Sequence, residues 1–192
     1  MNTLKINTYN LLVTLFILVV AATRVGINSS GQLHALTSFS PIGAMALFGG
    51  ACFRNRGAAF GIPLATLFVS DSLLAITVYS QYSHGILYSG WYWVYGAFLL
   101  MTLAGRWLLQ ELTVKNTLIA AFSITCIHWL VTDMGVWLGS SFYPQTVTGF
   151  WSCLAAAIPF ERNFLLATLF YSGILFGAFE WVKKSRPVLQ AD

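Results

Sequence analysis

The sequence predicts an all-α membrane protein with six transmembrane helices and both termini in the cytoplasm. Of the 192 residues, 57% are hydrophobic and 8% are charged, whereas about a quarter of the residues in soluble globular chains are charged. Apolar runs long enough to cross about 30 Å of hydrocarbon recur along the chain. The basic residues, moreover, fall mainly on one side of the resulting topology. Residues 1–192 are expected to form a single membrane domain, because no linker or low-complexity tract divides them.

Runs of roughly 20 apolar residues define the predicted spans. Five of them lie at about 8–27, 58–78, 91–110, 115–138 and 163–182. A sixth span, at about 40–53, is shorter, with Ser40 expected as its cap and Pro41 at its first helical position. Its run IGAMALFGGACF carries no charge, and a short span of this kind is stable when neighbouring helices bury it.

The segment between the fifth and sixth spans is expected to hold a short outer helix at about 148–158. Thr146 or Thr148 can cap this helix, and Pro159 is expected to end it. The last span then begins at Glu161-Arg162-Asn163. A helix too short to span either lies in the membrane interface or covers a cavity as a lid, and the sequence leaves both interpretations open.

Lysine and arginine accumulate in short cytoplasmic loops, which gives an independent test of the topology. With the N-terminus inside, eight of the ten basic residues lie on the cytoplasmic side, and only Arg24 and Arg162 lie outside. The outer loops, at about 28–39, 79–90 and 139–161, contain no lysine or arginine. This asymmetry supports an even number of spans. Lys5 followed by LLVTLFILVVAA also resembles a secretory signal peptide, but no clear cleavage site precedes Thr23-Arg24, so a retained helix is expected.

Composition and motifs exclude several classes of function. The net charge is +4, but the basic residues are scattered rather than clustered, so no nucleic-acid partner is expected. Three widely spaced cysteines form neither a disulfide framework nor a zinc site. No G-x-x-x-x-G-K-[ST] motif is present, so the chain has no ATP site of its own. No cofactor is predicted.

Ionisable residues inside a span are costly and are functional candidates by default. They are Arg24, Asp71, His128 and Asp133. Counting about 1.5 Å per residue places Arg24, Asp71 and Asp133 at one level in the outer half of the membrane. An arginine between two carboxylates makes either an ion pair that locks helices together or a ligand site, and the sequence alone leaves both open.

Aromatic and polar residues extend the predicted site. Trp129, Asp133 and Trp137 recur every four residues, so they share one helix face, which we interpret as the wall of a hydrated pocket. The outer loops contribute histidines and tyrosines, although an interfacial aromatic belt accounts equally for Trp91, Tyr92 and Trp93. The complete predicted substrate site comprises Arg24, His34, Asp71, His84, Tyr88, Trp129, Asp133, Trp137 and Arg162.

Several segments resemble a family of small bacterial membrane proteins that looks like the substrate-binding S components of energy-coupling-factor (ECF) vitamin transporters. The most specific is Ser40 to Gly50, SPIGAMALFGG; the others are Asp71, VTDMGVWL at 131–138 and AAAIPF at 155–160. The resemblance covers most of residues 20–180. It implies an S-component-like fold in the bacterial inner membrane, an outward pocket, a vitamin-like substrate and an ECF energy-coupling module as partner.

Solitary cobalamin transporters are the nearest functional relatives that the resemblance suggests, which makes cobalamin the first candidate substrate. In those relatives the outer loop after the third helix supplies a cysteine to cobalt, and this chain has no cysteine there. His84 stands in the comparable region, and imidazole is a competent axial cobalt ligand. His84 is therefore the candidate axial ligand.

Uptake of a small organic nutrient is thus the leading prediction, and two other classes remain open. One is a membrane enzyme, since His128 and Asp133 have the H-x-x-x-x-D spacing of acyltransferases. On a continuous helix these two side chains diverge by roughly 140°, which disfavours joint chemistry. The other is a ligandless membrane scaffold, which leaves the buried acids unexplained.

Overall fold

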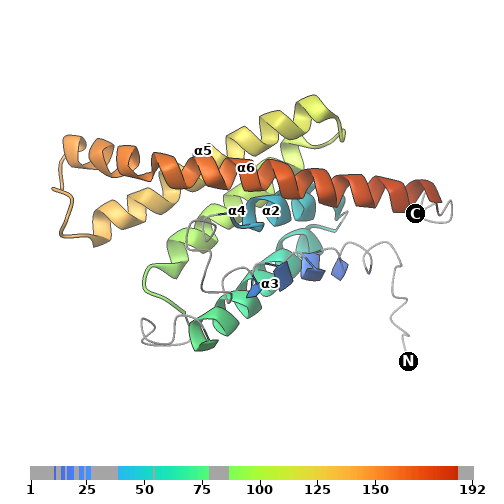
Figure 1. Ribbon diagram of the computed structural model, residues 1–192, viewed down its shortest axis with the longest axis horizontal. Coiled ribbons are helices and arrows are strands. Elements are labelled where there is room, and N and C mark those ends of the chain that lie inside the picture. The colour runs from blue at the N-terminus through green and yellow to red at the C-terminus, as the bar shows by residue number, and fades with distance from the viewer. Residues whose placement is uncertain are drawn as a thin grey trace.

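A computed structural model describes residues 39–53, 55–77 and 87–185, together with positions 11, 14–15, 17–19, 22–23 and 25–26, and omits the side chains of Lys183 and Ser185. These residues form helices and connecting turns, with no strand among them. The labelled helices are α2 (Ile42–Cys52), α3 (Arg56–Thr77), α4 (Trp91–Leu108), α5 (Val114–Gly139) and α6 (Val147–Ser185) (Figure 1). The described positions between 11 and 26 are also helical. The predicted all-α class is confirmed.

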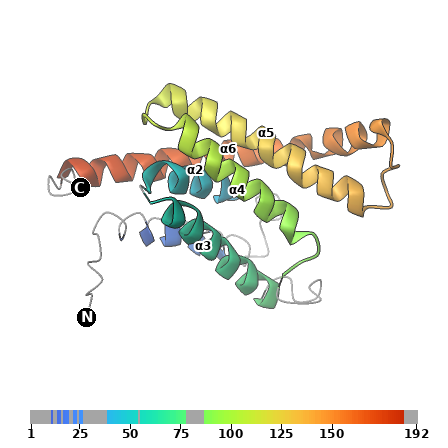
Figure 2. The same cartoon turned by 180° about the vertical axis from the view of Figure 1, so that it is seen from behind.

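Helix α2 lies at the centre of the bundle and packs against α3, α4, α5 and α6 (Figure 2). All of its residues except Ala51 are buried. A helix that is apolar on every side is stable only where other elements surround it. At about 1.5 Å per residue α2 is about 17 Å long, roughly half the hydrocarbon thickness. The prediction that neighbouring helices bury this short segment is confirmed.

Two glycines allow α2 and α4 to cross closely. A Cβ atom at Gly50 would overlap the carbonyl oxygen of Thr102 and lie 2.9 Å from the backbone nitrogen of Arg106. A Cβ atom at Gly105 would lie 3.0 Å from the Cα of Leu47. Small residues at such crossings let helix backbones approach in membrane proteins. The SPIGAMALFGG segment is therefore constrained by backbone packing.

The expectation that Pro159 ends an outer helix is wrong, because α6 runs without a break through Pro159 for 39 residues. Proline removes one N–H donor and crowds the preceding turn, but its fixed φ angle is compatible with a helix. Membrane helices tolerate proline where neighbouring helices hold them, and α6 packs along both α5 and α2. The outer helix predicted at about 148–158 and the span at about 163–182 are parts of one helix about 58 Å long.

The helix starts differ partly from expectation. The Thr146 hydroxyl accepts a hydrogen bond from the Gly149 N–H at 3.1 Å, so Thr146 is the cap of α6, one of the two predicted candidates. Ser40 does not cap α2. Pro41 occupies the cap position without a side-chain hydrogen bond, and the buried Ser40 hydroxyl has no partner among the described residues.

Three helices are long and apolar enough to cross a membrane: α3, α5 and the Val147–Val182 part of α6. Their outward faces carry exposed apolar side chains, such as Ile76, Phe122 and Phe170, as expected for lipid contact. The chain is therefore a helical membrane protein by the length and composition of these helices. The count of six spans and their orientation remain predictions.

The described helices place their ends in two groups. The Arg106 guanidinium donates a hydrogen bond of 3.0 Å to the Phe53 carbonyl, so the ends of α2 and α4 lie together. Residues 112–118 and 169–180 share a groove near that end. At the opposite end, residues 88–94, around the start of α4, lie beside residues 132–141, around the end of α5. Alternate helices therefore run in opposite directions across the bundle.

Candidate functional site

A cleft of about 610 Å³ opens between the first turns of α4 and the last turns of α5, the helices that lie side by side in Figure 2. Its lining combines aromatic rings, hydroxyl groups and backbone. The lining residues are Tyr88, Ser89, Gly90, Tyr92, Trp93, Val94, Thr132, Gly135, Val136, Gly139, Ser140 and Ser141. Of the predicted site residues, Tyr88 lies here.

Local sequence shapes this cleft. Gly90 has φ 78°, a left-handed conformation that turns the chain into α4 and favours glycine. Its carbonyl accepts a hydrogen bond of 3.0 Å from the Trp93 N–H. On α5, a Cβ atom at Gly135 would overlap the Trp93 ring, so the indole lies directly on the α5 backbone. The glycines at 90 and 135 thus set the position of the Trp93 ring in the cleft wall.

Trp129, Asp133 and Trp137 share one face of α5, as the four-residue spacing predicts, and α6 packs against that face. The Trp129 indole N–H donates to the Leu154 carbonyl at 3.1 Å, and the Trp137 indole N–H donates to the Pro144 carbonyl at 2.9 Å. The last turns of α5 therefore pack on α6 and the turn before it through this face, and its interpretation as the wall of a hydrated pocket stays a prediction.

The cleft lies along a different stripe of α5, formed by Thr132, Gly135, Val136 and Gly139. Positions separated by three, four and seven residues share a helix face, and this stripe is turned about 100° from the stripe that carries Asp133. The sequence analysis considered only the α5 face that carries Asp133. The cleft itself was missed because its glycines carry no chemical signal.

A second group of polar side chains lies between α5 and α6. The His128 Nδ1 and Glu161 Oε1 atoms are 2.8 Å apart, and the imidazole stacks on the Phe164 ring at a centroid distance of 4.2 Å. The Cys153 Sγ lies 3.9 Å from the Asp133 Oδ1. We call His128, Asp133, Cys153 and Glu161 the α5–α6 polar cluster.

Burial distinguishes the α5–α6 polar cluster from a surface ion pair. Glu161 is 7% exposed and Asp133 is 8% exposed. Glu161 and His128 are also within electrostatic range of the Asp133 carboxylate. The sequence analysis missed Glu161, because ending a helix at Pro159 placed this acid at a helix start instead of inside a span. Had Pro159 been treated as internal, Glu161 would have joined the intramembrane acids.

The remaining predicted site residues do not join these two groups. Asp71, 2% exposed, lies on α3, which packs on α2 and α4, whereas the contacts of Asp133 are with α6. Arg162 is exposed on α6. Arg24, His34 and His84 lie outside the described residues, so the predicted grouping of Arg24 with two acids and the cobalt-ligand role of His84 stay predictions.

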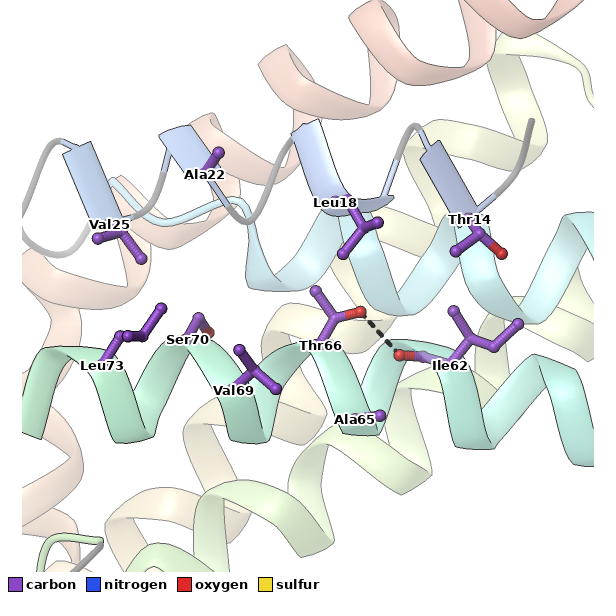
Figure 3. A pocket seen from close by; sticks show the side chains of 10 residues that line it. All are labelled: Thr14, Leu18, Ala22, Val25, Ile62, Ala65, Thr66, Val69, Ser70 and Leu73. Atoms are coloured by element: carbon purple, nitrogen blue, oxygen red, sulfur yellow. Dashed lines mark hydrogen bonds between the residues drawn. The ribbon is translucent and has the colours of Figure 1, made fainter. Parts of the chain in front are cut away.

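An apolar groove of about 430 Å³ separates the first helical segment from α3. In Figure 3, Thr14, Leu18 and Val25 face the α3 side chains across this groove. The Thr66 hydroxyl is turned back to its own helix, where it donates to the Ile62 carbonyl at 2.8 Å (Figure 3). With this largely apolar lining, the groove suits an acyl chain better than a polar solute.

Comparison with known proteins gives a family but no activity. No curated protein and no solved structure matches the chain. A model described as a family of unknown function, DUF6580, matches residues 4–189. Because this match spans nearly all of the 192 residues, the chain belongs to the DUF6580 family.

Proposed function

We propose that this protein is an S-component-like membrane transporter that binds a small organic nutrient at its outer side and moves it inward. The observation that carries the proposal is the cleft between α4 and α5. Its volume of about 610 Å³ lies in the usual range for small-molecule sites, about 300–1,000 Å³. Aromatic rings beside a few hydroxyl groups suit a flat, partly polar molecule.

The distribution of charge supports an outward orientation for the cleft. Arg56, Arg106, Lys115 and Lys184 lie at the end of the bundle opposite the cleft, at the starts of α3 and α5 and the ends of α4 and α6. The cleft-lining residues include neither lysine nor arginine. Under the positive-inside rule, the basic end faces the cytoplasm and the cleft faces the outside of the inner membrane.

The resemblance to ECF S components gives the substrate class, a vitamin-like compound, with cobalamin as the first candidate. Tyr88 belongs to both the predicted site and the cleft lining. His84 belongs to the predicted outer loop that precedes Tyr88 in the chain. His84 is the proposed axial ligand if cobalamin binds. Energy for uptake would come from a separate coupling module such as that of ECF transporters, from downhill flux or from chemical trapping inside, since the sequence has no nucleotide-binding motif.

Filling the cleft tests this proposal. No atom lies within 4 Å of a Cβ atom built at Gly139, so Gly139→Leu should occupy the cleft without disturbing the fold. Gly61→Leu is the matched control, because Gly61 on α3 is exposed and equally uncrowded. Purified wild-type protein is heated with hydroxocobalamin, riboflavin, thiamine, biotin or folate, and unfolding is followed by tryptophan fluorescence.

We expect at least one compound to raise the midpoint of unfolding in wild type and in Gly61→Leu, but not in Gly139→Leu. A ligand at a hundred times its Kd adds about 2.7 kcal/mol of stability, which is readily measured. Stabilisation that persists unchanged in Gly139→Leu would place the ligand elsewhere. The absence of stabilisation by all five compounds would remove the proposed substrate class.

A further inference from the structure

We propose that the α5–α6 polar cluster is a proton-binding site inside the membrane, which exchanges its proton along α6. The proposal does not rest on the function of the cleft, because it concerns the side chains between α5 and α6. His128, Asp133 and Glu161 gather where α5 and α6 pack together. A proton is the only ligand that this proposal requires.

The charges of the cluster indicate that it retains a proton. With both carboxylates ionised and His128 protonated, the cluster carries a net charge of −1. An uncompensated charge within a membrane span costs several kcal/mol. Adding one proton to either carboxylate makes the cluster neutral. The step forms one O–H bond on a carboxylate oxygen when the proton arrives from water and breaks that bond when it leaves.

Among the described residues, the surrounding helices supply no compensating cation. On α2, Cys52 is the only titratable residue, and it lies at the far end of that helix. On α4, Arg106 also lies at the far end, hydrogen-bonded to Phe53. Within the described residues, no lysine or arginine forms an ion pair with Asp133 or Glu161. Phe164 covers the imidazole and contacts α2 near Gly43.

One oxygen of the cluster is available to receive a proton. Glu161 Oε2 is buried and has no hydrogen-bond partner among the described residues, whereas Oε1 contacts His128. A buried, unpaired carboxylate oxygen is energetically costly. Protonation at Oε2 removes the charge while leaving the contact between Oε1 and His128 in place. This atom is therefore the proposed binding position.

Two hydroxyl groups extend from the cluster toward the opposite end of α6. Thr168 Oγ1 and Ser172 Oγ are buried and have no hydrogen-bond partner within the described part of the chain. They follow Glu161 by about 10 Å and about 16 Å along the helix. Ser172 and Glu180 line a groove of about 420 Å³ at that end. Hydroxyls both donate and accept, and buried polar sites of this kind hold water.

Labelling of the wild-type protein tests the site directly. Apolar carbodiimides react with protonated carboxyl groups in water-poor sites, and mass spectrometry locates the modified residue. We expect Glu161 or Asp133 to be labelled, and labelled faster at about pH 5 than at about pH 8. The labelling rate should fall by about tenfold per pH unit above the pH at which the proton dissociates. The exposed Glu111 is the internal reference and should remain unlabelled.

Variants then distinguish the signal of the α5–α6 polar cluster from that of other acids and test the proposed path of the proton along α6. Infrared difference spectra between about pH 5 and about pH 8 should contain a protonated-carboxyl band that Glu161→Gln or Asp133→Asn reduces and Glu111→Gln does not. Proton exchange after a pH jump should slow in Thr168→Val but not in Thr125→Val, since the Thr125 hydroxyl is already bonded to the Ala121 carbonyl at 2.8 Å.

Two results would overturn the inference. Wild-type labelling of Glu161 and Asp133 that is absent at every pH removes the proton-binding site, and labelling that is equal at about pH 5 and about pH 8 removes the exchange of its proton with water. Exchange that is equally fast in Thr168→Val and Thr125→Val removes the route along α6. Because both measurements use the protein without a solute, failure of the proposed transport function would leave their outcome unchanged.

Discussion

Replacement of Gly50 by alanine tests the central position of α2. The added methyl group would overlap the Thr102 carbonyl oxygen and lie 2.9 Å from the Arg106 backbone nitrogen. Both atoms belong to the α4 backbone, so relief requires α4 to move away from α2. Overpacking of this kind costs about 1–3 kcal/mol, and alanine recovers about 0.5–1 kcal/mol of helix stability. The net loss should be about 1 kcal/mol, the middle of these ranges, and at most about 2.5 kcal/mol.

The matched control is Gly96→Ala on α4, where no atom lies within 4 Å of the added Cβ. Only the gain in helix stability remains, so this variant should be neutral or more stable by up to about 1 kcal/mol. At about 2–4 °C per kcal/mol for a chain of this size, the two Tm values should move in opposite directions by a few degrees. Tryptophan fluorescence melting in detergent measures both shifts. A Gly50→Ala protein at least as stable as wild type would contradict the close crossing of α2 and α4.

Three further predictions concern α5, α6 and the topology. Glu161→Ala leaves His128 without its buried partner and should lower the free energy of thermal unfolding by about 3–5 kcal/mol. Glu161→Gln keeps an acceptor at the position 2.8 Å from His128 and should lower it less. Equal losses in the two variants would contradict a stabilising contact between His128 and Glu161. Trp129→Phe removes the donor to the Leu154 carbonyl and should cost about 1–3 kcal/mol in the same assay, and an unchanged Tm would show that the bond is unimportant. A cysteine at Ser141 should react with an impermeant thiol reagent from the outer side and one at Asn55 only after permeabilisation; outer-side labelling at Asn55 would contradict the orientation.

Local sequence patterns predicted the features that local forces determine. The long apolar runs gave α3, α4 and α5 to within a few residues, because span length follows membrane thickness. The shortness of the 42–53 run and its lack of charge correctly indicated a helix enclosed by others. Thr146 was recognisable as a cap because its hydroxyl satisfies an N–H in the first turn of α6.

Features that depend on packing were not predictable in this way. Pro159 is a local helix breaker, and only the contacts of α6 with α5 and α2 explain why the helix continues. That error concealed Glu161 as an intramembrane acid. The periodicity correctly grouped Trp129 with Asp133 and Trp137, but it does not indicate which helix covers their face. The cleft depends on the Gly135 backbone approaching Trp93, a tertiary contact without a sequence pattern.

Native mass spectrometry of the intact protein, released from detergent after purification from its own membrane, tests the binding of a nutrient at the cleft most directly. The proposed function predicts that wild type and Gly61→Leu carry the same small organic adduct and that Gly139→Leu lacks it, because the leucine side chain occupies the cleft. An adduct retained by Gly139→Leu, or lipid masses alone on the wild-type protein, would contradict the assignment of this cleft as a nutrient-binding site.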